Sequence, residues 1–404
     1  MDFKYSDEAE AFRREFRLWL EANMPQRRTT VDDDDIGSEI VRSDDSDWKF
    51  ALGWHRKMNA GGWVGVNWPK AYGGRGATLE QMVVYNEETV RAHAPGIVNG
   101  LGIMLVGPTL IHWGTEEQKK RYVPKILSAE EIWCQGYSEP GAGSDVASLN
   151  TRAVEEGDYF IVNGQKVWTS GADRADWCIL LVRTDPEAPK HKGISYLLVD
   201  MHSPGVTVRP LVQMTGEKGF NEVFFEDVKV PKKNLVGEKN QGWQVAVTTL
   251  MFERSSIATM RDMMTSVKKL AALAKKIGRN GGNAWQTAWD DTGVRQKIAG
   301  FACEAAALRY GNMRQLTRRL KGLPPGPEGS VGKLSASDLN LRMAKFALEL
   351  LGPYSQFEHG APLALDGGSW NYRMLAARAF TIAGGTSEIQ HNIIGERVLG
   401  LPKG

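Results

Sequence analysis

The chain has 404 residues, of which 42% are hydrophobic, and its 50 basic and 48 acidic residues leave a formal net charge of +2. This length and composition predict roughly two to three folded domains and exclude a mostly disordered chain. The near balance of charge gives no argument for a nucleic acid or an anionic membrane as partner.

Targeting and metal-binding signals are equally sparse. The first residues run directly into charged positions, and the sequence contains no run of about 18 apolar residues that would predict a membrane span. We therefore expect a soluble, cytoplasmic protein. The cysteines, Cys134, Cys178 and Cys303, are too far apart for a metal motif or a disulfide framework. The seven histidines form no paired motif, so we predict no bound metal.

Helical periodicity dominates residues 1–129. Residues 6–23 place Ala9, Phe12, Phe16, Trp19 and Leu20 on one face, with Arg13, Arg14 and Arg17 outside it, which predicts an amphipathic helix. Residues 115–118 form a capping box that begins a second helix, ending near residue 127. The acidic run 32–35 is interpreted as a solvated loop, because no calcium-loop pattern surrounds it.

Short strands replace the helices at about residue 130. Segments 178–183, 193–199, 206–212 and 223–230 are rich in β-branched and aromatic residues. The pair Asn163-Gly164 lies between two further strand-like segments and is typical of a hairpin turn. We therefore expect a small antiparallel β domain over residues 130–237.

Helical periodicity returns near residue 242. A Gly/Asn/Trp-rich insertion at 278–291 and a Pro/Gly loop at 323–332 separate the helices, and residues 337–351 form a clear helix that Gly352-Pro353 ends. The sequence thus predicts an α+β multidomain protein, with a helical domain at 1–129, a β domain at 130–237 and a helical domain at 238–404.

The run Ser-Glu-Pro-Gly-Ala-Gly-Ser-Asp at residues 138–145 is typical of a loop that holds a polar ligand against an apolar wall. Taken alone, it is more often an ordinary surface turn. Together with Asn-Gly-Gln-Lys-Val-Trp-Thr-Ser-Gly at 163–171 and Gly-Gly-Thr-Ser-Glu at 384–388, it resembles the acyl-CoA dehydrogenase family over nearly the whole chain. The resemblance implies an N-terminal helical domain, a middle antiparallel β-barrel-like domain and a C-terminal four-helix bundle.

The resemblance also implies bound FAD, and the first segment supplies part of its site. By the family motif, Gln135, Tyr137 and Ser138 would lie along the flavin ring, and Ser144 near the phosphate or pantetheine region. No Gly-x-Gly-x-x-Gly run follows a predicted strand and opens a helix, so a Rossmann-type flavin site is disfavoured.

The other two segments complete the implied cofactor site. Trp168, Thr169 and Ser170 would border the flavin face away from the substrate, whereas Trp168 taken alone would more often be a core residue. Thr386 and Glu388 would contact the cofactor at the start of a helix, which Thr386 or Ser387 can cap.

Two family motifs are altered. The usual Arg-x-x-Phe motif is absent from the region ending at 290–296, where Arg295 is the candidate replacement for binding the cofactor. The usual Gln-x-x-Gly-Gly run is replaced by Glu-Leu-Leu-Gly-Pro at 349–353. Binding of the adenine side of FAD is therefore expected to differ or to be lost.

The implied activity is α,β-dehydrogenation of an acyl-CoA thioester, in which a carboxylate removes the α-proton. Many family members carry this Glu directly before Gly-Thr-Ser, where this chain has Ala383-Gly384. The branch that includes isovaleryl-CoA dehydrogenase places it on a helix before an Arg, and Glu253-Arg254 is similar. We predict Glu253 as the base, desolvated by the apolar residues 250–252. The alternative is a solvated helix Glu that pairs with Arg254.

Residues around the reacting carbons indicate the substrate. The small pair Ala383-Gly384 leaves space there, which predicts a bulky, branched or ring-bearing acyl group, as in actinobacterial steroid or branched acyl-CoA dehydrogenases. Ser144, Arg254 and Gly384 are the candidate substrate contacts, with Arg254 either orienting the base or binding CoA.

The resemblance implies that electrons pass to an electron-transferring flavoprotein and that the chain forms a homo- or hetero-oligomer, a dimer or a tetramer. Two alternatives stay open. The chain is a non-catalytic or partner subunit of a heteromeric acyl-CoA dehydrogenase, or it is a flavin oxidase or monooxygenase on the same scaffold.

Overall fold

The computed structural model describes residues 4–25, 45–255, 263–278, 287–323, 326–358 and 360–403. The chain forms two compact units, Met1–Ala258 and Thr259–Gly404. The acidic run at 32–35 lies outside the described residues.

The first unit begins with helices that bury one apolar face each. The hydroxyl of Ser6 accepts a hydrogen bond from the amide of Ala9 and begins α1, whose buried residues include Phe12, Phe16 and Leu20, as predicted. The predicted capping box begins α5, where Thr115 and Gln118 cap each other. The helices before the sheet are α1 (Asp7–Asn23), α2 (Asp45–Ala60), α3 (Leu79–Ala92), α4 (Gly107–Trp113) and α5 (Glu116–Ser128).

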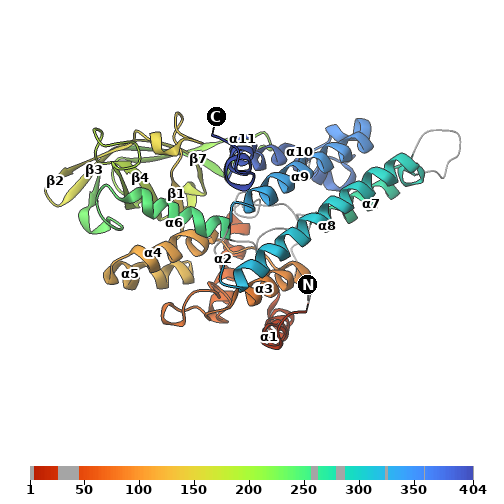
Figure 1. Ribbon diagram of the computed structural model, residues 1–404, viewed down its shortest axis with the longest axis horizontal. Coiled ribbons are helices and arrows are strands. Elements are labelled where there is room, and N and C mark those ends of the chain that lie inside the picture. Colours follow the sequence, from red (N-terminus) through yellow and green to blue (C-terminus); the bar gives the residue numbers. More distant parts are fainter. Residues whose placement is uncertain are drawn as a thin grey trace. The chain divides into compact units, whose positions relative to one another are not determined.

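A seven-stranded sheet follows, in the order β1-β4-β2-β3-β7-β6, with β5 paired to β4. Figure 1 labels β1, β2, β3, β4 and β7 of this sheet. Most neighbouring strands are antiparallel, as predicted, while β4 pairs in parallel with β1 and β2. After the sheet, α6 (Gly242–Ser255) packs against β5 and α4. The strands are β1 (Trp133–Gly136), β2 (Arg152–Glu156), β3 (Tyr159–Ser170), β4 (Trp177–Arg183), β5 (Ile194–Asp200), β6 (Val206–Leu211) and β7 (Phe220–Pro231).

The predicted hairpin turn at Asn163-Gly164 is wrong. β3 runs through both residues, and the turn of the β2–β3 hairpin is Gly157-Asp158, where Gly157 has φ 56°. Asn163 and Gly164 instead form an irregularity in the pairing of β3 with β7. The Asn163 side chain bonds both the amide and the carboxylate of Asp227 across it. Long-range strand pairing has therefore overridden a local turn preference.

The second unit is helical. Its apolar core joins α7, α8, α9 and α10, and includes Leu270, Ile298, Met343 and Trp370. The helix α9 begins eight residues before the predicted 337–351 helix, within the segment expected to be a loop, and it packs against α7, α8, α10 and α11. The helices are α7 (Met263–Lys276), α8 (Thr292–Leu320), α9 (Gly329–Leu351), α10 (Ser369–Phe380) and α11 (Ser387–Ile393).

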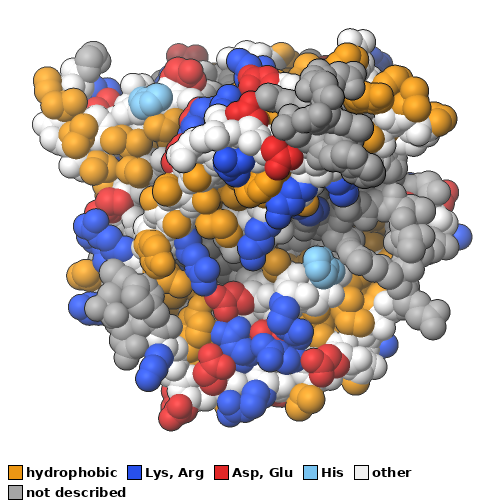
Figure 2. Space-filling model, turned by 90° about the vertical axis from the view of Figure 1, so that its right-hand side faces the viewer, with side chains coloured by type: hydrophobic (Ala, Val, Ile, Leu, Met, Phe, Trp, Pro, Cys, Tyr) orange, Lys and Arg blue, Asp and Glu red, His pale blue; other side chains and the backbone are white. Residues whose placement is uncertain are grey.

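On the face drawn in Figure 2, Lys and Arg side chains lie next to Asp and Glu side chains, with hydrophobic side chains between them. Such mixing of signs weakens any extended field of one charge. No helix in the described part of the chain has both the length and the apolar character that crossing a membrane requires.

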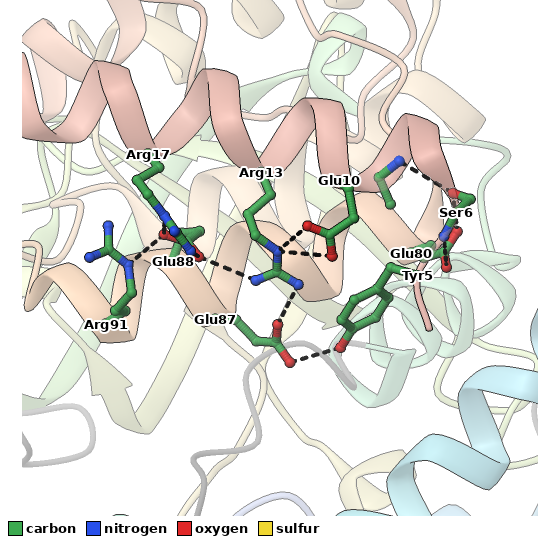
Figure 3. Close-up of polar contacts among 10 residues, drawn as sticks. Tyr5, Ser6, Glu10, Arg13, Arg17, Glu80, Glu87, Glu88 and Arg91 are labelled. Carbon is green, nitrogen blue, oxygen red and sulfur yellow. Dashed lines mark hydrogen bonds and ion pairs between the residues drawn. The ribbon is translucent and has the colours of Figure 1, made fainter. Parts of the chain in front are cut away.

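One buried carboxylate joins α1 to α3 (Figure 3). The Glu88 side chain is 1% exposed and accepts hydrogen bonds from Arg13, Arg17 and Arg91 at 2.6–3.2 Å. Burial opposes ionisation of Glu88, but the three guanidinium groups outweigh it and lower its pKa from 4.5 to about 2. The arginines that the sequence placed outside the apolar face of α1 thus hold the helix to its neighbour.

Glu88→Gln should therefore lower the free energy of unfolding by at least about 2 kcal/mol. The loss is smaller than for a fully buried ion pair, because Arg17 and Arg91 reach water. The folded-state pKa lies below the unfolded one, so the carboxylate's contribution is complete above pH 4.5 and is lost as the pH falls toward 2. Urea unfolding at several pH values checks both effects. Equal midpoints for variant and wild type at pH 7 would contradict the assignment.

Candidate active site

The two segments that carry the family motif lie side by side in the first unit. β1 leads into the loop at 137–145, and the amide of Val167 in β3 donates to the carbonyl of Ser138 at 2.9 Å. The backbone of β1 also passes close to β4, since a Cβ at Gly136 would come within 2.8 Å of the Leu180 side chain. A residue with a side chain at Gly136 would push these strands apart.

An ion pair is buried between these segments. The Lys166 side chain is fully buried, and its Nζ donates to the Glu139 carboxylate at 2.8 Å and to the Tyr137 carbonyl at 3.1 Å. Glu139 also accepts from the amides of Asn150 at 2.7 Å and Thr151 at 2.9 Å. Sequence reasoning missed this pair, because its members are separated by 27 positions.

The electrostatics of the pair follow from its burial. Removal from water lowers the pKa of Lys166 to about 8, although the charge of Glu139 opposes that shift. Burial also disfavours the ionised form of Glu139, but Lys166 and the donors at Thr151 and Asn150 lower its pKa overall. Both groups are therefore charged at neutral pH.

The second segment presents a flat ring and an unsatisfied hydroxyl. Trp168 is 60% exposed, with φ 61°, and its ring meets the edge of Phe220 at 6.2 Å. Core packing, the alternative for Trp168, is therefore excluded. Among the described residues, the buried Thr169 hydroxyl and the Nε2 of Gln135 have no hydrogen-bond partner. A flavin needs an apolar neighbour and polar partners along its ring edge, and this donor set fits that need.

The remaining residues of the first two segments differ in exposure. Tyr137 is buried, with its ring edge-on to Tyr196 at 6.2 Å, while Ser138 and Ser170 are half-buried. Ser144 is exposed. Its neighbour Asp145 pairs with Lys190 in the loop between β4 and β5.

The predicted base lies on α6. Thr249 of this helix is buried and shares hydrogen bonds with Thr109 of α4 at 2.9 Å and Tyr196 of β5 at 3.4 Å. These contacts hold α6 against the sheet. Glu253 and Arg254 belong to the last turn of α6, and their side chains lie outside the described residues.

The third segment forms a turn in the second unit. Gly384 and Gly385 have φ values of 65° and 90°, which favour glycine, and Thr386 caps α11 by accepting from the amide of Ile389. The Lys333 ammonium donates to the Gly385 carbonyl at 2.7 Å. The Gln390 side chain donates to the carbonyls of both glycines at 3.1 and 3.2 Å.

Two further predicted cofactor residues also lie in the second unit. Glu388 is exposed, and hydrogen bonds from its own backbone and from Thr386 lower its pKa. Arg295 lies near the start of α8. Its guanidinium donates hydrogen bonds to the carbonyls of Trp289 and Asp290, at 2.9 and 2.8 Å, and to the Thr292 hydroxyl. Its predicted role at the cofactor stays a prediction.

Within the described ranges, no three His, Cys, Asp or Glu side chains are grouped so as to hold a metal ion.

Family models cover most of the chain. Residues 6–130 match the N-terminal domain of acyl-CoA dehydrogenases, residues 134–228 the middle domain and residues 240–399 the C-terminal domain. A relative, the acyl-CoA dehydrogenase IpdE1 of Mycobacterium tuberculosis, is 36% identical over 98% of both chains. This chain belongs to the acyl-CoA dehydrogenase family. It is accordingly an FAD-dependent oxidoreductase with the predicted helical, β and helical architecture.

Solved structures of family members are similar over the full length. A steroid acyl-CoA dehydrogenase, Tcur3481-Tcur3483, aligns with a TM-score of 0.84 at 30% identity and covers 100% of both chains. The ChsE4-ChsE5 complex of Mycobacterium tuberculosis aligns with a TM-score of 0.80, again at 30% identity and 100% of both chains.

The register of β3 is open to a direct test. A Cβ at Gly164 would lie 2.5–2.8 Å from atoms of Thr151, including its backbone Cα. Gly164→Ala should therefore cost roughly 1–3 kcal/mol, because the backbone of Thr151 must move. A Cβ at Gly141 meets no described atom within 4 Å, which makes Gly141→Ala the matched control. The thermal unfolding midpoints of both variants measure this cost. Equal midpoints would contradict the close packing of Gly164 against Thr151.

Proposed function

We propose that this chain oxidises the α,β bond of a bulky, ring-bearing acyl-CoA thioester. Two observations support this substrate class. The position directly before Gly-Thr-Ser, at Ala383-Gly384, carries small, exposed residues and leaves space for a ring system. Aligned structures also bear the name steroid acyl-CoA dehydrogenase.

The cofactor site is proposed to be built mainly on the two joined segments. Gln135 and Thr169 carry buried polar groups without partners among the described residues, and Trp168 offers an exposed ring beside them in sequence. This set of unsatisfied groups is the single observation that carries the assignment. Tyr137, Ser138, Ser144, Ser170, Arg295, Thr386 and Glu388 complete the proposed cofactor contacts. FAD, when bound, accepts the hydride from the β-carbon.

Glu253 is proposed to remove the α-proton, with Ser144, Arg254 and Gly384 contacting the substrate. An α-proton beside a thioester is weakly acidic, so the base needs a raised pKa and a fixed position. The hydrogen bonds of Thr249 with Thr109 and Tyr196 support the second requirement, because they anchor α6. Arg254 follows the base directly and is proposed to orient it or to bind CoA.

We further propose an electron-transferring flavoprotein as the electron acceptor. A second candidate role is a partner subunit of a heteromeric enzyme, favoured by the two-component names of the ChsE4-ChsE5 and Tcur3481-Tcur3483 relatives. In that role the chain would complete a site whose base comes from another subunit. A flavin oxidase on this scaffold would instead form peroxide in air without an added acceptor.

Glu253→Gln should leave the absorbance of bound flavin unchanged and lower turnover by about 10²–10⁴-fold, since proton abstraction loses its base. Single-turnover bleaching of the flavin by an acyl-CoA measures this directly. Glu117→Gln, which changes an exposed carboxylate of α5, is the control and should behave as wild type. Full turnover of the Glu253 variant would refute the assignment of Glu253 as the base.

Acyl-CoA preference provides the test of the substrate class. The ratio kcat/KM should be highest for thioesters with a ring or a branch near the reacting carbons, because Ala383-Gly384 leave a void beside a straight chain. Competition between a steroid side-chain thioester and a straight medium-chain thioester measures the ratio. A marked preference for the straight chain would refute the bulky-substrate proposal while leaving the base assignment intact.

A further inference from the structure

The Lys166–Glu139 ion pair lies where the two proposed flavin segments meet. Lys166 directly precedes Val167, whose amide donates to the Ser138 carbonyl at 2.9 Å. The Lys166 Nζ donates a hydrogen bond to the carbonyl of Tyr137, which directly precedes Ser138, at 3.1 Å. The carbonyls of Tyr137 and Ser138, consecutive residues of the first segment, are therefore bonded to Lys166 and Val167, consecutive residues of the second.

Glu139 extends this connection to the far end of the loop. Its two carboxylate oxygens accept from the amides of Asn150 and Thr151, and one of them also accepts from Lys166. The hydroxyl of Thr151 in turn donates to the Gln165 carbonyl at 3.4 Å. One carboxylate thus closes the loop 140–149 at both ends and ties it to β3.

Removing both charged side chains from water costs free energy, and a geometric role of the pair explains why this cost is tolerated. Lys166 is fully buried and Glu139 is 7% exposed. The other ionisable groups that act on Lys166 are Cys178 and Arg183 of β4. Buried ion pairs contribute little net stability compared with apolar side chains of the same volume, but they strongly define the geometry of the groups they bond.

We propose that Lys166 and Glu139 are positioning residues that set the FAD affinity by holding the two segments in register. They act through the backbone at Tyr137 and Val167, and both side chains are themselves buried. This inference rests on the proposed flavin site. A positioning role differs from a purely stabilising role in one measurable respect. Removing both charges should restore the stability of the β domain but not the register of the two segments.

The test compares Lys166→Met, Glu139→Gln and the double variant in the full-length chain. Each single change leaves a buried charge without its partner and should lower the thermal midpoint of the apoprotein. The double variant removes both charges and should regain most of that stability. The Tyr137 carbonyl still lacks its donor, however, so the Kd for FAD should stay at least about tenfold above wild type. The long-wavelength absorption band of bound flavin should stay altered as well.

Glu88→Gln serves as the matched control, since Glu88 is also a buried carboxylate of the first unit but pairs with Arg13, Arg17 and Arg91. It should lower the thermal midpoint and leave the FAD Kd and absorption band unchanged. If Lys166→Met does not fold, Glu139→Gln and the double variant decide the question.

The outcomes separate the two proposals. Recovery of FAD affinity together with stability in the double variant overturns the positioning role alone. An equal loss of affinity in Glu88→Gln overturns it too, because any destabilisation would then suffice. A wild-type apoprotein that takes up no FAD overturns the proposed flavin site, and the positioning role falls with it.

Discussion

The geometry of the β domain depends on one ion pair, between Lys166 and Glu139, that is buried away from water. Lys166 has no contact with water, so its charge is tolerable because Glu139 and the Tyr137 carbonyl receive its hydrogen bonds. These short contacts leave little freedom in how β3 lies against the loop that follows β1. The irregularity at Gly164 adds to this constraint, because β3 approaches the Thr151 backbone so closely that a side chain has no space there.

A second buried carboxylate in the same unit shows how context changes the role of such a charge. Glu88 is nearly as buried as Lys166, but its partners Arg17 and Arg91 extend to the surface, and it joins two helices, α1 and α3, rather than a strand and a loop. Arg13 and Arg17 belong to a helix already held by Phe12, Phe16 and Leu20. The same electrostatics therefore strengthens an interface in one place and defines loop geometry in the other.

This chain belongs to its family over nearly its whole length but departs from the family pattern at the position of the base. Residues 6–399 match the three acyl-CoA dehydrogenase domains almost without interruption. Small residues replace the usual glutamate before Gly-Thr-Ser, and a Glu-Arg pair occurs on α6 instead. A relocated base and an enlarged acyl site have one common physical cause in this proposal, since moving the carboxylate frees the volume it occupied.

The sequence alone was sufficient wherever the decisive interaction is local. The burial face of α1, the capping box at Thr115 and the cap of α11 depend on residues three or four positions apart. The first two were predicted, and Thr386 was one of the two residues predicted to cap α11. Motif resemblance also predicted the family and its three-part architecture. The hairpin at Asn163-Gly164 was predicted wrongly, because pairing with β7 outweighed a turn preference. The exposure of Trp168, the two unsatisfied polar groups and the Lys166–Glu139 pair came from the tertiary structure alone. The energies that decide them come from burial and from contacts between distant residues, which no local pattern encodes.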